Sequence, residues 1–524
     1  MERNILEQQI LNLTKDIKID EQNFDTLFAI DNVPLWWFFN RFITTNILPS
    51  LASFDEIHAF LEGNLNLKAT PFQVFFLRKA LRISNTLNQL LQKNKVTQVT
   101  HNTPFFLTYY SHITSKGVYR LQPILNNVEK STLIYAPSFI RVVKFPQNLS
   151  GLLLYTSLTQ QLKEKAQQKA SQLHKLWKAQ GRSALQNRSQ NIHPLLFTAL
   201  KSHLSLLFSE EFLYLTFLNH YALEALIETY QPSVFCITAS IGLLEKSVIV
   251  ICNKKNIPTL LLQHGFDTDF RRTSMSQFHN LYFAVYGKED KKLLEETNVS
   301  SKNIFVTGGS QFDGLEEYIS KTPEKVEIKN ILLLSQPFVE DKLFTKEQHL
   351  HFLREVETIA QSLDAHLTIK LHPRDNKSFY DQYVKGKNIT LLSDSLYPAI
   401  QNSDLVISVV STTISESVVL NKPVVVLDLF NHAKEKAYVK RGVVLYATSS
   451  QDVSQKLSLF FSFFTSVAFA RKRKEYIEDF FCGLDGKATK RIVETIEKLS
   501  RSTTFKNKKQ PKNHKSAGKR LIVS

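Results

Sequence analysis

The sequence predicts an α/β protein built from two Rossmann-like domains in tandem, and three observations lead to this fold class. The chain has 524 residues, more than one hydrophobic core usually holds, so two domains are expected. Short, continuous apolar runs alternate with helical segments, which is typical of parallel sheets covered on both faces. This pattern ends and begins again near residue 330.

Residues 1–95 are predicted to form a helical N-terminal extension. Pro34 precedes the aromatic run LWWFFNRFI, and a proline in the first turn favours a helix start. The side chains of Trp36, Trp37 and Phe38 are expected to pack onto the next domain rather than to bind a ligand.

Residues 96–315 are predicted to form the first Rossmann-like domain, and residues 329–499 the second domain with its closing helices. Sheets of this kind bind ligands at the carboxyl ends of their strands, so the two domains are expected to share a cleft there. Predicted strands of the first domain include SVFCITAS (233–240), TLLLQHG (259–265), YFAVYG (282–287) and IFVTGG (304–309), and those of the second include NILLLSQP (330–337), HLTIKLHP (366–373), DLVISVVS (404–411) and PVVVLDL (423–429).

The cysteines and the apolar runs indicate a compartment. Three cysteines occur without a CxxC pair, so neither a disulfide framework nor a cysteine zinc site is expected, and a reducing compartment fits. The polar N-terminus lacks the layout of a signal peptide, and no run reaches the ~18–20 apolar residues that span a bilayer. We therefore expect a cytoplasmic protein, soluble or peripheral on the inner face of the cell membrane.

Residues 500–524 are predicted to form a disordered basic tail. The formal net charge is +17, and residues 501–524 hold eight Lys or Arg and no acidic residue. Such an excess calls for an anionic partner, which could be nucleic acid, lipid headgroups or a phosphorylated substrate. The tail either solubilises the chain or attaches it to an anionic membrane surface, where each basic residue contributes about 1 kcal/mol. The sequence has no helix-turn-helix, RNP-type strand or zinc finger, so we expect no nucleic acid partner.

The segment SVVSTTISESVVLNKPVVVLD (408–428) predicts a strand, a hydroxyl-rich turn and a helix. The free backbone N–H groups and the positive end of such a helix converge on one point, which suits a phosphate. Ser411, Thr412 and Thr413 would add hydroxyl donors, and Glu416 would accept hydrogen bonds from ribose hydroxyls. The simpler interpretation is that Ser411 or Thr412 only caps the helix, and the two roles are compatible.

A histidine follows one strand of each predicted domain. In the second domain His372 would donate to a phosphate oxygen as the leaving group gains charge, and Arg374 would add positive potential. In the first domain His264 precedes Gly265, whose missing side chain permits the close approach of a substrate. An imidazole near the acceptor hydroxyl would serve as general base, since its free pKa lies near neutral pH. Its rivals as the base are Asp267, Asp269 and Glu245.

A glycine turn, VTGGSQFD (306–313), follows the last predicted strand of the first domain. It lacks the GxGxxG pattern of a dinucleotide site, so Gly308 and Gly309 are expected to form a tight crossover between the domains. The sequence also lacks GxxxxGK[ST], HExxH and a DxD pair in a strand–loop context. Neither a metal nor a cofactor is expected, because helix dipoles and basic groups can neutralise a leaving nucleotide.

Together these segments resemble the GT-B glycosyltransferase superfamily over about residues 230–499. More narrowly they resemble enzymes of bacterial capsule, lipopolysaccharide and teichoic-acid synthesis, namely the CDP-glycerol glycerophosphotransferases, the CMP-sugar transferases and the UDP-N-acetylglucosamine 2-epimerases. His372-Pro373 and Ser411-Thr412-Thr413 are similar to the HP and Ser/Thr motifs that bind donor phosphate in CMP-sugar transferases. Gln263-His264-Gly265 is similar to the loop that holds a proposed base in glycerophosphotransferases, and residues 307–313 resemble the shared "TGxPxxD" crossover.

The resemblance implies a metal-independent GT-B glycosyltransferase with an acceptor domain followed by a nucleotide-donor domain. It would move a sugar, or a glycerol-phosphate-like group, from a nucleotide-activated donor to a glycan or lipid-linked acceptor of a surface polysaccharide. The alternative is a nucleotide-sugar 2-epimerase on the same fold, and a nucleic-acid-binding protein is a third, less favoured hypothesis.

Overall fold

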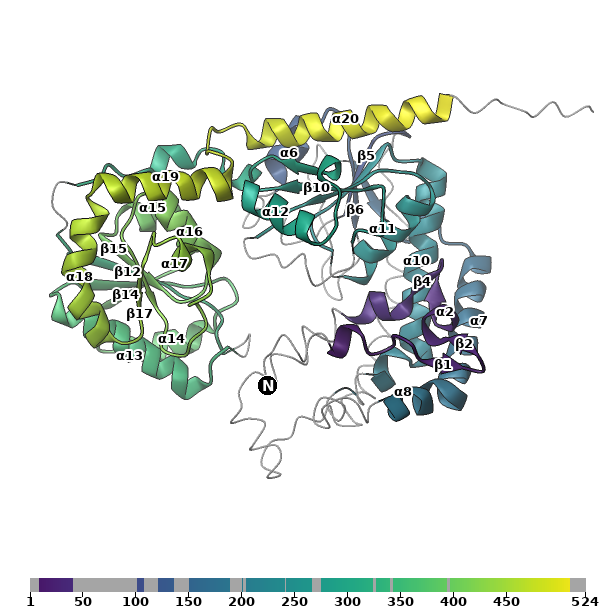
Figure 1. Ribbon diagram of the computed structural model, residues 1–524, viewed down its shortest axis with the longest axis horizontal. Helices are drawn as coiled ribbons and strands as arrows, with labels where there is room; N and C mark the ends of the chain where they lie inside the picture. The colour runs from purple at the N-terminus through teal and green to yellow at the C-terminus, as the bar shows by residue number, and fades with distance from the viewer. Residues whose placement is uncertain are drawn as a thin grey trace, which may run out of the picture.

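The computed structural model confirms the predicted tandem α/β fold. Each of its two domains holds a parallel sheet flanked by helices, and the domains lie side by side (Figure 1). The structure describes residues 9–40, 101–107, 121–135, 150–188, 200, 204–240, 242–265, 275–323, 327–339, 343–393 and 396–508.

The N-terminal domain is built on a seven-stranded parallel sheet with the strand order β11-β10-β9-β8-β5-β6-β7. The order reverses between β5 and β8, which makes this point a topological switch. All residues of β8 and β9 are buried, as their continuous apolar runs require. The strands are β5 (Pro104–Leu107), β6 (Thr132–Tyr135), β7 (Ser150–Leu153), β8 (Val234–Ile237), β9 (Thr259–Leu262), β10 (Leu281–Val285) and β11 (Ile304–Val306), and the helices among them include α6 (Gln122–Asn127), α11 (Leu243–Lys254) and α12 (Lys288–Glu296).

The C-terminal domain has a six-stranded parallel sheet with the order β14-β13-β12-β15-β16-β17. Its switch point lies between β12 and β15, which pair in parallel. The strands are β12 (Asn330–Leu334), β13 (His366–Lys370), β14 (Ile389–Leu392), β15 (Leu405–Ser408), β16 (Val424–Leu427) and β17 (Leu445–Ala447), and the helices are α13 (Lys346–Ser362), α14 (Lys377–Tyr383), α15 (Leu396–Gln401), α16 (Thr412–Val419), α17 (Ala437–Lys440), α18 (Ser450–Phe464) and α19 (Val467–Phe481).

The described part of the N-terminal extension differs from the helical prediction, because it contains two short antiparallel hairpins. β1 (Lys18–Ile19) pairs with β2 (Gln22–Asn23), and after the short helix α2 (Phe24–Leu27), β3 (Ala29–Ile30) pairs with β4 (Val33–Pro34). Asp31 and Asn32 form the two-residue turn of the second hairpin with φ values of 49° and 63°. Asp and Asn tolerate this left-handed region better than other side chains, so they favour a hairpin here. A helical segment follows from residue 35, and residues 41–100 lie outside the described residues.

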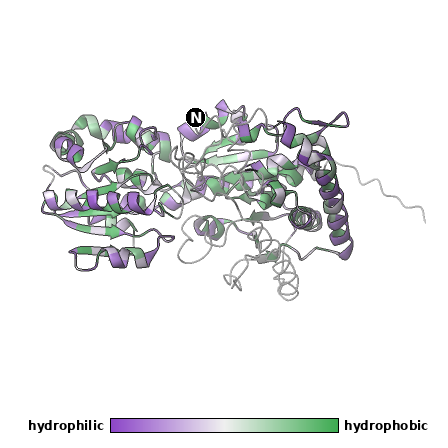
Figure 2. Ribbon diagram, turned by 90° about the horizontal axis from the view of Figure 1, so that it is seen from below, coloured by the Kyte–Doolittle hydropathy of each residue, from purple (hydrophilic) through white to green (hydrophobic). Residues whose placement is uncertain are grey.

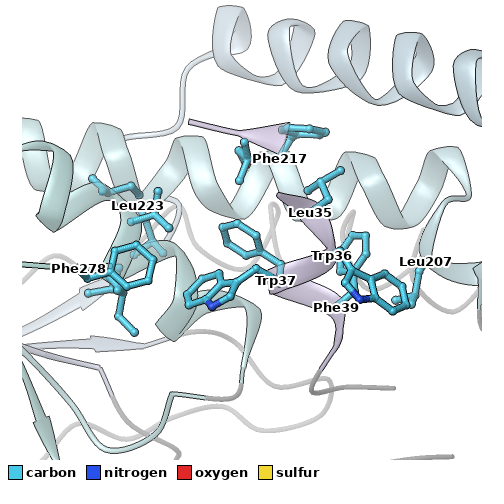
Figure 3. Packing of buried hydrophobic residues seen from close by; sticks show 14 of the residues in the cluster. Leu35, Trp36, Trp37, Phe39, Leu207, Phe217, Leu223 and Phe278 are labelled. Atoms are coloured by element: carbon cyan, nitrogen blue, oxygen red, sulfur yellow. The ribbon is translucent and has the colours of Figure 1, made fainter. Parts of the chain in front are cut away.

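The aromatic run after Pro34 packs onto the N-terminal domain, as the sequence predicted. The ring centroids of Trp37 and Phe278 are 5.1 Å apart, and both side chains lie in the cluster of Figure 3. The indole N–H of Trp36 donates to the Ile10 carbonyl. The buried amine of Lys246 donates to the carbonyls of Trp37 and Phe38 of this helix. The extension also contacts a helical insertion between β7 and β8, whose described elements include α7 (Gln160–Leu176), the π-helical segment Trp177–Gly181, α8 (Arg182–Arg188) and α10 (Glu210–Tyr230).

The C-terminal helix α20 (Ala488–Lys508) crosses back from the second domain and packs on the first (Figure 1). Ile492 and Ile496 lie in one apolar cluster with Leu121 and Phe106 of the N-terminal domain. Asp313 caps the helix, because its carboxylate accepts the N–H groups of residues 488 and 489 at 2.9 and 2.8 Å. The helix extends to Lys508, so the first residues of the segment predicted as a disordered tail are helical, and residues 509–524 lie outside the described residues.

Helix α19 makes a second connection between the domains. A Cβ atom on Gly287 would lie 1.9 Å from the carbonyl oxygen of Asp479, so only glycine lets the two backbones meet. Beside this contact Arg441 pairs with Glu289 at 2.9 Å and with Asp479 at 3.0 Å. These contacts and α20 hold the domains together at one side.

A buried histidine makes the stability of the C-terminal domain depend on pH. His349 on α13 is 3% exposed, and burial lowers the pKa of its imidazole to about 4. An unfolded histidine titrates near pH ~6.5, so below that pH the unfolded chain binds this proton first. The contribution of neutral, buried His349 to the free energy of unfolding is complete above pH ~6.5 and is lost as the pH falls toward ~4. We predict that this group removes about 2 kcal/mol of unfolding free energy between neutral pH and pH ~5.

The matched variant His349→Gln has no titrating group and still offers a hydrogen bond to the Tyr380 hydroxyl, which lies 3.0 Å from Nε2 in the native chain. Denaturant unfolding at the two pH values should show a smaller loss of stability for this variant. An equal loss in both proteins would contradict the assignment to His349.

Candidate functional site

The switch point of the C-terminal sheet brings several polar side chains together. Ser335 and Gln336 follow β12, and Ser411 follows the neighbouring strand β15. The chain leaves these two strands in opposite directions, which opens a crevice at their carboxyl ends. The amide nitrogen of Gln336 donates to the Ser411 hydroxyl at 2.9 Å, so one hydrogen bond crosses the switch point.

The hydroxyl turn predicted at residues 411–413 forms the N-terminus of α16. The hydroxyl of Ser411 is the cap, and it accepts the backbone N–H of Thr413 at 3.2 Å. It also lies 2.6 Å from the Thr413 hydroxyl. Ser411, Thr412 and Thr413 are all partly exposed, whereas Glu416, one turn later, is 8% exposed. The capping role is therefore present, and the first N–H groups of α16 add partial positive charge at the same point.

His372 lies in a loop that hydrogen bonds hold against β12. Its backbone N–H donates to the Ser335 hydroxyl at 3.1 Å and to the Asp375 carboxylate at 2.7 Å, and the Ser335 hydroxyl donates to the same carboxylate. The His372 ring is partly exposed, and Arg374 is exposed. Asp375 and Ser335 therefore fix the backbone that carries the histidine.

A further hydrogen bond in this loop determines the tautomer of His372. The backbone N–H of Arg374 donates to Nδ1 of the ring at 3.1 Å. A backbone N–H cannot accept a hydrogen bond, so Nδ1 is unprotonated and the neutral ring carries its proton on Nε2. The imidazole can then donate to an anion through Nε2, as the sequence analysis required of it.

In the N-terminal domain the loop after β9 approaches the hydroxyl turn. The Gln263 side chain supports this loop, since it donates to the Gly265 carbonyl at 3.0 Å and accepts the Tyr286 N–H at 2.8 Å. A Cβ atom built on Gly265 would lie 4.0 Å from Cγ2 of Thr412, which belongs to the other domain. His264 precedes Gly265, is partly buried and lines a small cavity with Gly309 and Ile492. We call Gly265, His372, Ser411 and Thr412 the interdomain site, and His264 adjoins it in the chain.

The glycine turn at residues 308–309 lies next to α20. Gly308 has a φ of 78°, and a Cβ atom there would lie 3.0 Å from Cβ of Ala488. A Cβ atom on Gly309 would lie 2.8 Å from the Tyr286 ring. Gly309 and His264 also line a small cavity of about 20 Å³, which has room for about one water molecule.

Asp267, Asp269 and Glu245 were the other predicted candidates for the base. Asp267 and its rival Asp269 lie outside the described residues. The other rival base, Glu245, is 6% exposed in the first turn of α11. Within the described ranges no three His, Cys, Asp or Glu side chains are grouped so as to hold a metal ion.

Sequence reasoning did not identify Ser335, Gln336 and Asp375. The sequence did contain a pattern that could have identified two of them. NILLLSQP places Ser335 and Gln336 at the end of the first strand of a Rossmann-like domain, where ligands bind. Asp375 follows His372 by three residues, a spacing that lets a carboxylate accept N–H groups of its own turn.

Two parallel-sheet domains, a switch-point site and a C-terminal helix that returns to the first domain define the GT-B type of fold. Residues 252–497 match the family model described as UDP-N-acetylglucosamine 2-epimerase. This match confirms the resemblance predicted from the motifs, and it relates the chain to nucleotide-sugar enzymes. None of the curated proteins compared with the chain matches it.

Several solved structures are similar to the chain. UDP-GlcNAc 2-epimerase from Neisseria meningitidis, bound to UDP-GlcNAc, is 14% identical with a TM-score of 0.42, over 76% of this chain and 99% of that one. A putative UDP-N-acetylglucosamine 2-epimerase from Listeria monocytogenes is 12% identical with a TM-score of 0.45, over 76% and 97%. The wall teichoic acid polymerase TagF is 11% identical with a TM-score of 0.43, over 84% and 100%.

The hydroxyl turn leads to a prediction about nucleotide binding. We predict that Ser411→Ala weakens the binding of a nucleotide diphosphate or monophosphate about tenfold, because one direct donor and the cap that orders the turn are both lost. Isothermal titration with the nucleotide that stabilises the native protein measures this effect.

Ser449→Ala is the matched control, since Ser449 caps α18 through the N–H of Asp452 at 3.1 Å. Both variants lose a cap that contributes about 1 kcal/mol. Only Ser411→Ala should lose affinity, and equal affinities in the two variants would contradict a phosphate role for the turn.

Proposed function

We propose that this chain is a glycosyltransferase that moves a sugar, or a glycerol-phosphate-like group, from a nucleotide-activated donor to a glycan or lipid-linked acceptor. The observation that carries this proposal is the approach of Gly265 to Thr412, which brings a loop of each domain to the same point. Group transfer needs two substrates to meet, and a site shared by two domains can bind one on each side. Synthesis of a bacterial surface polysaccharide, such as a capsule, lipopolysaccharide or teichoic acid, is the process that the motifs favour.

The donor phosphates would bind at the N-terminus of α16. Ser411, Thr412 and Thr413 offer hydroxyl and backbone donors, and Nε2 of His372 offers a further N–H. The negative charge on the leaving nucleotide grows as its bond to the transferred group breaks. These donors bind the growing charge more strongly than the ground state, and this difference lowers the barrier. Arg374 would contribute charge from the edge of the site, and Glu416 would accept from the ribose.

The acceptor would bind on the side of the N-terminal domain. Its hydroxyl attacks the transferred group, and His264 takes the hydroxyl proton as the general base. Asp267, two residues beyond Gly265, is the rival for this role. In both versions the nucleotide leaves with its bonding electron pair, and no metal or cofactor takes part.

The second candidate is a nucleotide-sugar 2-epimerase, and the match of residues 252–497 to that family's model favours it. An epimerase would use the same donor side but needs acid and base groups that remove and return a proton on the sugar. Asp375, which lies next to the interdomain site, accepts the backbone N–H of His372 and so already has a structural partner. This arrangement supports the transferase as the first candidate.

Two assays distinguish the candidates. A thermal-shift screen with CMP, CDP, UDP and GDP identifies the product nucleotide, because a ligand that binds only the folded state raises the melting temperature. The protein is then incubated with the corresponding activated donor without an acceptor. Appearance of an isomerised donor would favour the epimerase, and turnover that requires an added glycan or lipid-linked acceptor would favour the transferase.

The histidine variants test the donor side directly. We predict that His372→Ala lowers kcat about a hundredfold or more, because a donor to the leaving group is removed. His366→Ala is the matched control at the opposite end of β13, where the ring contacts the Thr390 hydroxyl. Full activity of the His372 variant, or an equal loss in both variants, would contradict the proposed role.

A further inference from the structure

Helices α18 and α19 form an elbow at the outer side of the C-terminal domain (Figure 1). The helices meet at Thr465 and Ser466 and are bent by 83°. In the part of the chain that the structure describes, no single helix is long and apolar enough to cross a membrane, but this bent pair passes the same test by length and composition.

The inner face of the elbow packs into the core of the C-terminal domain, and this packing holds the two helices at their angle. Phe460, Phe464 and Phe469 are buried and contact one another, with Phe464 and Phe469 centroids 5.0 Å apart. The Tyr476 hydroxyl lies 2.7 Å from the Ser415 hydroxyl of α16. Many of the apolar residues of this segment are therefore explained by packing within the domain.

The outer face also carries apolar side chains, which core packing does not explain. Leu459 is 77% exposed and Val467 is 88% exposed, one on each side of the bend. Among the described residues only one other large hydrophobic side chain, Ile319 at 39%, is exposed. Single exposed apolar residues are ordinary, but these two flank the same corner and can contact one partner together. Figure 2 shows hydrophobic and hydrophilic residues alternating along the helices of both domains.

Positive charge predominates at the bend, and the exposed carboxylates Glu475 and Glu478 follow further along α19. Residues 453–474 hold five Lys or Arg and no Asp or Glu. Arg471, Lys472 and Lys474 are exposed on the first turns of α19. Arg473 instead turns inward and donates to the carbonyls of Val418 and Val419. Three cations thus face solvent next to the apolar corner.

We propose that the elbow docks on the surface of an anionic lipid bilayer. Leu459 and Val467 enter the boundary between headgroups and acyl chains, and the three exposed cations of α19 contact the phosphates of the headgroups. An apolar tip beside basic residues is the composition that binds such an interface, and each cation near it contributes attraction. A second copy of this chain would bring like charges to the same surface, which opposes self-association. The proposal does not depend on the proposed transferase activity.

Vesicle flotation with the full chain tests the apolar part. The vesicles are either mixed phosphatidylglycerol and phosphatidylcholine or phosphatidylcholine alone. The native chain should float with the anionic vesicles, and Leu459→Gln/Val467→Gln should bind them about tenfold or more weakly, because two apolar side chains are no longer transferred from water. Ile319→Gln, a substitution of the third exposed hydrophobic side chain, should leave binding unchanged.

Neutralisation tests the charged part. Arg471→Gln/Lys472→Gln/Lys474→Gln should lose about tenfold in affinity and part of its salt dependence. The control is Lys288→Gln/Lys292→Gln/Lys302→Gln, which removes three exposed lysines from the N-terminal domain. Melting temperatures are compared first, so that a loss of folding is recognised.

Three results would overturn the proposal. The native chain does not float with anionic vesicles, or both elbow variants bind as well as the native chain, for example through the basic residues of 509–524. The third is a change from dimer to monomer in light scattering caused by Leu459→Gln/Val467→Gln, which would assign the corner to self-association. The proposal stands only if binding is lost in both elbow variants and kept in both controls.

Discussion

The hydrogen bond from Gln336 to Ser411 crosses the switch point of the C-terminal sheet, and the candidate site is arranged around it. Gln336 follows the first strand of this sheet and Ser411 caps α16, so the bond fixes the end of one strand against the start of one helix. Ser335, the preceding residue, holds the loop of His372. Two consecutive side chains therefore position both the hydroxyl turn and the histidine, which explains how donors from separate loops converge.

The candidate site also requires that the N-terminal domain be held in a fixed position relative to the C-terminal domain. Asp313 caps α20 just after the crossover, and Arg491 of that helix donates to the Thr307 carbonyl at 2.8 Å. With Gly287 against the backbone of α19, these contacts fix the angle between the domains. In this arrangement of the domains a Cβ atom on Gly265 would lie 4.0 Å from Cγ2 of Thr412. The glycine turn itself packs against α20, since a Cβ atom on Gly308 would lie 3.0 Å from Cβ of Ala488.

Much of the fold could be predicted from local pattern. Buried parallel strands give continuous apolar runs, so both sheets and the second start of the pattern near residue 330 were predicted correctly. The hydroxyl turn and the loop of His372 could be placed at strand ends because each follows such a run. The turn of Asp31 and Asn32 was missed because the aromatic run after it dominated the interpretation of that segment as helical.

Other features could not be predicted because they depend on partners distant in the sequence. Gln336 and Ser411 are 75 residues apart, and no local pattern links them. The apolar face of α20 predicts that the helix is packed, but it does not say that its partner is the first domain. The exposure of Leu459 likewise could not be predicted, because it belongs to an apolar run in which other side chains, such as Leu457, Phe460 and Phe464, are buried.

The central claim is that a nucleotide phosphate binds between the hydroxyl turn and His372. The most direct measurement is a crystal structure of the chain with the nucleotide that stabilises it best. Our account predicts a phosphate oxygen about 3 Å from the first N–H groups of α16 and from Nε2 of His372, with Gly265 facing the transferred group. A phosphate bound instead in the groove at the amino ends of β12 and β13, which His366 and Lys329 line, would contradict it.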